Sequence, residues 1–272
     1  MSWSKKKKIC SAIVFVSIAL VLAIEIFFAE GLRATEAGNN FYEITVRSIG
    51  IAVFLSLALL MDYGYIFKNT ANKNIHAWLA LAAGFAIAIN NFPFVSLING
   101  DAYLGGRASD ILIYALICFC VGCFEELAFR GFVFMVALEK MPKNKKGAFG
   151  AIFISSAIFG IVHGVNILAG GSVGGVLLQI GYSALIGALS AVMLMNTHNL
   201  WYSIFMHALY NFGGGVVPKF GGGKIWTAGE VALTVVVSLI VVAYVIYNFV
   251  RLPDAHISGV FGKTKEEKHD NA

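Results

Sequence analysis

Three charged residues interrupt an otherwise apolar stretch, the segment CFEELAFRGF at residues 123–132. A charge at the centre of a membrane helix costs about 2.5–3.5 kcal/mol, and residues of this kind are functional candidates by default. Glu126 and Arg130 are four residues apart, so they share a helix face and can pair. Glu125 is turned by about 100° from Glu126. We therefore expect Arg130 to neutralise Glu126, while Glu125 needs a partner from another segment. The alternative is that all three only hold helices together.

Two further apolar segments carry polar residues that could complete a site. His163 lies in FGIVHGVN, and His207 and Asn211 lie in MHALYN, four residues apart on one helix face. A lone histidine in an apolar helix is more often a hydrogen-bonded packing residue than a catalyst. Here, however, three segments each contribute a polar group that is costly in lipid. We expect Glu125, His163, His207 and Asn211 to converge inside a helical bundle.

This set of side chains suits the hydrolysis of a peptide bond. A carboxylate in a cavity of low dielectric can act as the general base for water and then as the acid for the leaving amine, and a neutral histidine can share or relay the proton. Donors from His207 and Asn211 could reach one oxygen, and such a donor is worth about 3–4 kcal/mol in the barrier. The sequence has no G-x-S-x-G motif, and no cysteine belongs to the set. A serine or cysteine nucleophile is therefore not expected.

A zinc-dependent version of the same hydrolysis is the alternative mechanism. The sequence has no H-E-x-x-H motif, but Glu125, His163 and His207 could form a zinc site of two histidines and one carboxylate. Asn211 is a poor zinc ligand and a good hydrogen-bond donor. We therefore favour water activated directly by Glu125, with no metal and no other cofactor.

The three motifs resemble those of the CPBP family, the CAAX-prenyl-endopeptidase-like and bacteriocin-processing intramembrane proteases also called the Abi family. EELAFR is similar to its E-E-x-x-x-R motif, FGIVH to F-x-x-x-H, and HALYN to H-x-x-x-N, in the same order along the chain. The resemblance covers about residues 120–212. It implies an eight-helix endopeptidase in which Glu125 and His163 activate water and His207 and Asn211 stabilise the oxyanion. Glu126 and Arg130 would be supporting residues.

The composition independently indicates an all-α, polytopic membrane protein. The chain is 58% hydrophobic and only 13% charged, and its mean hydropathy is +0.78. A spanning helix needs about 20 mostly apolar residues. About eight segments meet that requirement, at residues 9–29, 44–66, 76–98, 109–139, 148–168, 173–195, 200–216 and 228–250. We expect Pro93 to kink or end the third, His163 to lie deep in the fifth, and the short seventh to run into the glycines at 213–215.

The distribution of basic residues places both termini in the cytoplasm. With that orientation most lysines and arginines fall on the cytoplasmic side, as the positive-inside rule requires. The outer segments hold only Arg33, Arg47, Arg107, Lys219 and Lys224. The net charge of +5 is explained by the cytoplasmic loops, so we expect no nucleic-acid partner.

The chain divides into three regions on this basis. Residues 1–108 hold the first three helices, 109–216 the protease-like core, and 217–272 the last helix and a polar tail. We interpret the basic, apolar N-terminus as a retained first helix rather than a signal peptide, because its apolar run is long. The partners expected are the lipid bilayer and a membrane-associated peptide or protein. A multi-pass protein of a bacterial plasma membrane fits these features.

Two other functions are compatible with the pattern. The polar residues could stabilise the bundle of a non-catalytic membrane immunity or scaffold protein of the same fold. Intramembrane glutamate and histidine also build the proton relays of transporters. The sequence shows no inverted repeat and no paired broken helices, which makes the transporter the least favoured of the three.

Overall fold

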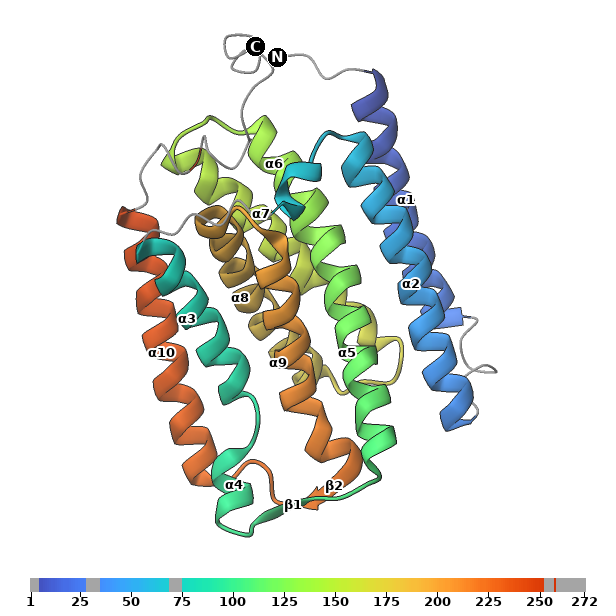
Figure 1. Ribbon diagram of the computed structural model, residues 1–272, viewed down its shortest axis with the longest axis vertical. Helices are drawn as coiled ribbons and strands as arrows, with labels where there is room; N and C mark the ends of the chain where they lie inside the picture. The colour runs from blue at the N-terminus through green and yellow to red at the C-terminus, as the bar shows by residue number, and fades with distance from the viewer. Residues whose placement is uncertain (1–4, 28–34, 69–74, 252–256, 258–272) are drawn as a thin grey trace.

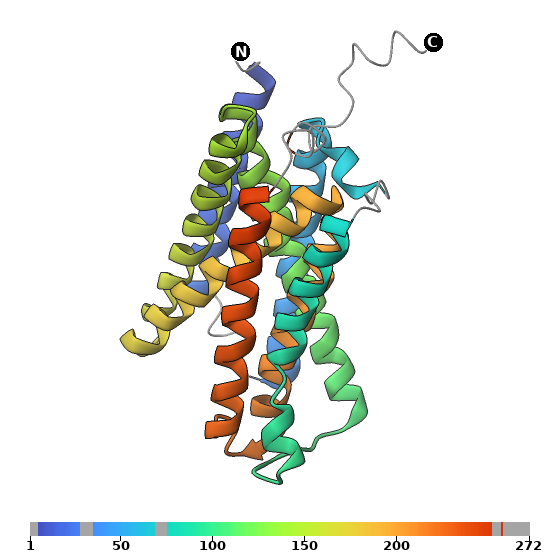
Figure 2. The same ribbon diagram turned by 90° about the vertical axis from the view of Figure 1, so that its left-hand side faces the viewer.

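The computed structural model describes residues 5–27, 35–68, 75–251 and 257, and within them the chain is an all-α bundle (Figures 1 and 2). The elements in order are α1 (Lys5–Phe27), α2 (Glu36–Leu60), η1 (Gly64–Phe67), α3 (Ile75–Asn90), α4 (Phe94–Ile98), β1 (Ala102–Leu104), α5 (Ala108–Ala128), η2 (Phe129–Phe134), α6 (Met135–Lys140), α7 (Lys145–Val162), η3 (His163–Ile167), α8 (Val173–Thr197), α9 (Leu200–Phe220), β2 (Gly221–Gly223) and α10 (Ala228–Arg251). The predicted fold class is confirmed.

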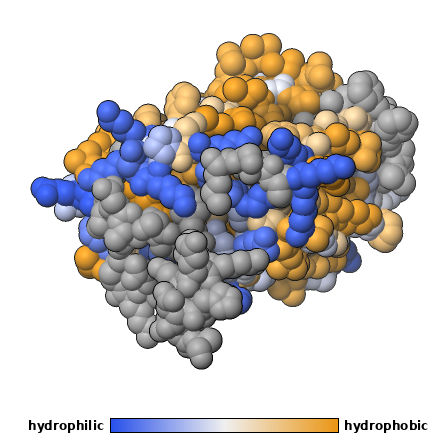
Figure 3. Space-filling view, turned by 90° about the horizontal axis from the view of Figure 1, so that it is seen from above, coloured by the Kyte–Doolittle hydropathy of each residue, from blue (hydrophilic) through white to orange (hydrophobic). Residues whose placement is uncertain are grey.

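Five helical segments in the described part of the chain are long and apolar enough to cross a membrane. They are Glu36–Leu60, Ala108–Lys140, Lys145–Ile167, Val173–Thr197 and Ala228–Asn248. Figure 3 looks onto the end of the bundle where α1 begins, and hydrophilic residues gather there. Each of the eight predicted spans overlaps a helix, but 44–66 runs past the end of α2 into η1, and 76–98 covers both α3 and α4. How many of them cross the membrane, and the cytoplasmic position of both termini, stay predictions.

Several helix boundaries differ from those expected. The third helix ends at Asn90, just before Pro93, as predicted. The seventh does not stop at the glycines, because α9 continues through them to Phe220. His163 is not deep within a helix. It caps the C-terminal end of α7, where the chain tightens into the 3₁₀ helix η3.

Arg47, which we counted with the outer segments although it falls within the predicted span 44–66, lies in the middle of helix α2. Helix α2 begins at Glu36, eight residues before the apolar run at 44, because Thr35 caps it by accepting a hydrogen bond from Gly38 N. Arg47 therefore lies inside the apolar span Glu36–Leu60. Its side chain is only 11% exposed, and Nη2 lies 3.3 Å from Oε2 of Glu43, one turn earlier.

Helix α5 is the central element and packs against α9 on one side and α2 on the other. Gly122 makes the first contact possible, since a Cβ there would lie 3.1 Å from the backbone of Ile204 and of Ala208. The helix then passes into α6 through a π-helical turn, η2, which contains Arg130. A π turn shifts the helical register, and such turns are frequent at functional sites.

The end of the bundle where α1 begins is held by one carboxylate. Glu139 accepts a hydrogen bond from Tyr63 Oη at 2.7 Å and also contacts Lys7 of α1. Burial, and then the hydrogen bond to Glu139, raises the pKa of Tyr63 far above its ordinary value. The phenol therefore stays protonated and remains a donor.

The opposite end is closed by a short β pair and by a short helix. Strand β1 pairs antiparallel with β2, with Ala102 opposite Gly223. The short helix α4 is tied to the start of α10, because Oε2 of the buried Glu230 accepts a hydrogen bond from Ser96 N at 3.1 Å. These contacts fix the ends of α3, α9 and α10 around the interior of the bundle.

Candidate active site

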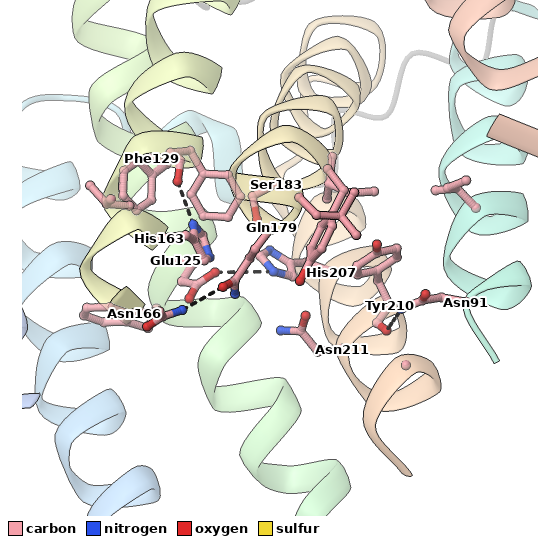
Figure 4. A pocket seen from close by; sticks show the side chains of 18 of the residues that line it. Asn91, Glu125, Phe129, His163, Asn166, Gln179, Ser183, His207, Tyr210 and Asn211 are labelled. Atoms are coloured by element: carbon pink, nitrogen blue, oxygen red, sulfur yellow. Dashed lines mark hydrogen bonds and ion pairs between the residues drawn. The ribbon is translucent and has the colours of Figure 1, made fainter. Parts of the chain in front are cut away.

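A cavity of about 820 Å³ lies inside the bundle, and Glu125, His163, His207 and Asn211 all line it (Figure 4). Their side chains come from α5, the α7–η3 junction and α9. The structure thus brings the four sequence-derived candidates together from three segments. Their catalytic roles stay predictions.

Glu125 contacts His207 of helix α9. Its Oε2 lies 3.4 Å from His207 Nε2, and its side chain is 20% exposed within the cavity. The dashed line between these two residues in Figure 4 marks that contact. The expectation that Glu125 would need a charged or polar partner from another segment agrees with this geometry.

Glu126 does more than pair with Arg130. Its Oε1 lies 3.1 Å from Arg130 Nη1, as the spacing predicted. The same oxygen lies 2.8 Å from His207 Nδ1 and accepts a hydrogen bond from Ser190 Oγ at 3.3 Å. Because the residue is completely buried, its carboxylate sits behind His207 and not in the cavity. The interpretation of Glu126 as a residue tied only to Arg130 was therefore incomplete.

Arg130 is held by an aromatic ring as well as by the carboxylate. Its guanidinium carbon lies 4.3 Å from the centroid of Phe159. The Phe159 ring also meets His163 and His207 edge to face, at centroid distances of 4.9 and 5.8 Å. A Cβ at Gly187 would lie 2.6 Å from Arg130 Nη2, so only glycine leaves room for the arginine. Phe159 thus links the ion pair to both histidines.

The backbone fixes the tautomer of a neutral His163. Its Nδ1 lies 2.8 Å from the carbonyl oxygen of Phe159. A carbonyl oxygen only accepts hydrogen bonds, so Nδ1 carries the proton and Nε2 keeps its lone pair. The position of His163 at the end of α7, where the helix tightens, sets this contact. Nε2 is therefore suited to accept a hydrogen bond from water.

Several polar residues of the cavity wall lie outside the set of site residues derived from the sequence. Asn166 Nδ2 donates to Gln179 Oε1 at 2.8 Å, which links η3 to α8. Asn91 Nδ2 donates to the carbonyl of Tyr210 at 2.8 Å and joins α3 to α9. Arg47 lines the cavity from α2. Their position inside apolar segments was the available signal, since polar residues there face the bundle interior.

The zinc alternative depends on the placement of Glu125, His163 and His207. Among the residues that the structure describes, no group of three histidine, cysteine, aspartate or glutamate side chains is placed to hold a metal ion. Glu125, His163 and His207 as positioned do not form the three-ligand set considered from the sequence.

Fold and site together define an integral multi-pass membrane protein with a cluster of acids and histidines in its interior. Residues 107–213 match the family model described as type II CAAX prenyl endopeptidase Rce1-like. The matched segment runs from the start of α5 into α9 and contains all three motifs. The family recognised from those motifs is thereby confirmed over this segment. Comparisons with curated proteins and with solved structures gave no match.

Proposed function

We propose that this protein is an intramembrane endopeptidase that hydrolyses a peptide bond of a membrane-associated, CAAX-type substrate. The observation that carries the proposal is the relation between Glu125 and two histidines on the wall of one cavity. Glu125 contacts His207 at 3.4 Å and shares the cavity with His163, while a second glutamate holds His207 from behind. The match of residues 107–213 to the Rce1-like family supports the same reaction.

Glu125 would act first as a base and then as an acid. A water molecule between its carboxylate and Nε2 of His163 would donate one proton to Glu125 while its oxygen attacks the carbonyl carbon of the substrate. The tetrahedral intermediate would collapse by breaking the C–N bond. Glu125 would return the proton to the amine that leaves. His163 orients the water by accepting its second hydrogen bond.

His207 and Asn211 would stabilise the negative oxygen of the intermediate. In this role His207 would donate hydrogen bonds through both ring nitrogens, since Nδ1 lies against Glu126 and Nε2 faces Glu125 and the cavity. With Nδ1 donating to Glu126, Nε2–H would then point to the cavity as a donor. Asn211, one helical turn away on α9, would supply the second donor.

The test is cleavage of a farnesylated CAAX peptide by the purified protein in liposomes. The wild-type protein should release the C-terminal tripeptide, and Glu125→Gln should lose at least about 10³-fold in kcat, as expected for loss of the general base and its charge. Asp110→Asn is the matched control, since Asp110 lies in the first turn of the same helix and pairs with exposed Arg107.

The outcomes separate the protease from a non-catalytic membrane protein of the same fold. Cleavage by Glu125→Gln at the wild-type rate would remove the proposed mechanism. If the wild-type protein leaves the CAAX peptide intact, a second experiment tests for another peptide substrate. Mass spectrometry identifies the membrane peptides that accumulate in cells carrying Glu125→Gln. No accumulation in that experiment would favour the scaffold or immunity function.

A further inference from the structure

Arg47 is a charged residue in the middle of an apolar helix for which the hydrolytic mechanism has no use. It lies inside the span Glu36–Leu60, is 11% exposed and lines the same cavity as Glu125. We propose that Arg47 binds the free C-terminal carboxylate of the peptide substrate and so restricts cleavage to bonds near a chain end. This inference rests on the proposed protease function and adds a determinant of its specificity.

The charges on the cavity wall support this role. Among the described residues that line the cavity, Arg47 is the only lysine or arginine and Glu125 the only carboxylate. Arg130 is completely buried behind the wall and paired with Glu126. An ionised carboxylate that enters such a space needs an opposite charge, because its desolvation is otherwise very costly. Among the described residues of the cavity wall, Arg47 is the cation that can pair with such a carboxylate.

The guanidinium is held close to the catalytic helix. Its carbon lies 5.4 Å from the centroid of the Phe124 ring, and Phe124 directly precedes Glu125. Gly50, one turn after Arg47, allows this approach of α2 to α5, since a Cβ there would lie 2.4 Å from the Phe124 ring. Arg47 is therefore positioned beside the turn of α5 that carries the general base.

The contact with Glu43 orients Arg47 and is compatible with a second carboxylate. Glu43 meets the guanidinium through Nη2 at 3.3 Å. A guanidinium has five donors in a planar fork, and this fork matches a carboxylate in a bidentate manner. A peptide with a free C-terminus carries both a carboxylate that Arg47 can bind and, nearby, the bond to be cut. An internal loop of a membrane protein has peptide bonds but no terminal carboxylate.

The experiment uses one farnesylated CAAX peptide in two forms, with a C-terminal acid and with a C-terminal amide. The ratio of kcat/KM for acid over amide should be at least about tenfold in the wild-type protein, as expected for a hydrogen-bonded charge pair. In Arg47→Gln that ratio should fall towards one. In the control Arg107→Gln it should stay at the wild-type value, because Arg107 is exposed at the N-terminal start of α5 and does not line the cavity.

Binding measured in the inactive Glu125→Gln background makes the test independent of turnover. The acid should bind at least about tenfold more tightly than the amide, and adding Arg47→Gln should remove the difference. Equal binding of the two forms, including no binding of either, would overturn the role of Arg47, and the protease function would then be judged from cleavage alone. An equal loss of acid and amide cleavage in Arg47→Gln would assign Arg47 to structure and would also overturn the proposal.

Discussion

His207 lies between two adjacent glutamates, with Nδ1 2.8 Å from Glu126 Oε1 and Nε2 3.4 Å from Glu125 Oε2. Successive residues on a helix diverge by about 100°, so they rarely meet one side chain of a neighbouring helix. The two nitrogens of an imidazole point in different directions, so a single histidine can contact both carboxylates. One histidine on α9 thus joins the buried ion pair to the cavity.

Loss of Arg130 should destabilise the protein strongly. Arg130→Met leaves the buried Glu126 without its cation, and breaking a buried pair in this way costs about 3–5 kcal/mol. The double variant Glu126→Gln with Arg130→Met should recover part of that stability, because it leaves no unpaired charge. It should not recover activity, since His207 then lacks the carboxylate that holds Nδ1. Thermal unfolding in detergent and peptide cleavage check the two effects separately.

The contrary result would be a double variant that cleaves at the wild-type rate. Glu126 would then serve stability only, as a partner of Arg130, and the hydrogen bond to His207 would have no part in the reaction.

His163→Gln should lower kcat by about 10²–10⁴ with little change in KM, because the variant lacks the imidazole that is proposed to orient the attacking water by accepting its second hydrogen bond. Stability should change little, since the fold loses a single hydrogen bond to the Phe159 carbonyl. Steady-state kinetics and thermal unfolding measure both. His76→Gln is the control, because His76 lies in the first turn of α3 and does not line the cavity. An unchanged kcat in His163→Gln would exclude a role for His163 in activating water.

Gly122→Ala should destabilise the bundle by about 1–3 kcal/mol and reduce activity. The new Cβ would lie 3.1 Å from backbone atoms of α9, which cannot rotate away, so α5 and α9 must separate. That separation lengthens the contacts of Glu125 and Glu126 with His207. The matched control is Gly174→Ala near the start of α8, where a Cβ meets nothing within 4 Å and should be neutral or slightly stabilising. Equal thermal stability of both variants would contradict the argument.

Activity should survive removal of metal ions. Purified protein treated with 1,10-phenanthroline, and shown by elemental analysis to be free of zinc, should cleave its peptide at the untreated rate. That result is expected from the proposed activation of water by Glu125 without a metal. Loss of activity that returns on adding Zn²⁺ would favour the zinc-dependent mechanism with Glu125, His163 and His207 as ligands.

Much of the fold and of the candidate set of residues could be predicted from the sequence, because both depend on the free-energy cost of placing polar groups in lipid. Apolar runs of about 20 residues mark helices whatever their neighbours are. The same cost singled out Glu125, Glu126, Arg130, His163 and His207, whose side chains have to face the interior. Helix ends were less predictable. The start of α2 depends on the cap Thr35, and the apolar run from residue 44 does not reveal it.

The sequence by itself determined that this is a helical membrane protein and which polar side chains its interior must accommodate, because hydropathy and helical spacing are local properties. Only the tertiary structure decided how these side chains pair. It placed His207 between both glutamates, fixed the proton of His163 on Nδ1, and set Arg47 on the cavity wall. Those contacts depend on the distance and rotation between helices. The close approach of α5 and α9 at Gly122 and the change of helical register in the π turn Phe129–Phe134 govern that distance and rotation. The regular helical period of the sequence reveals neither the close approach nor the π turn.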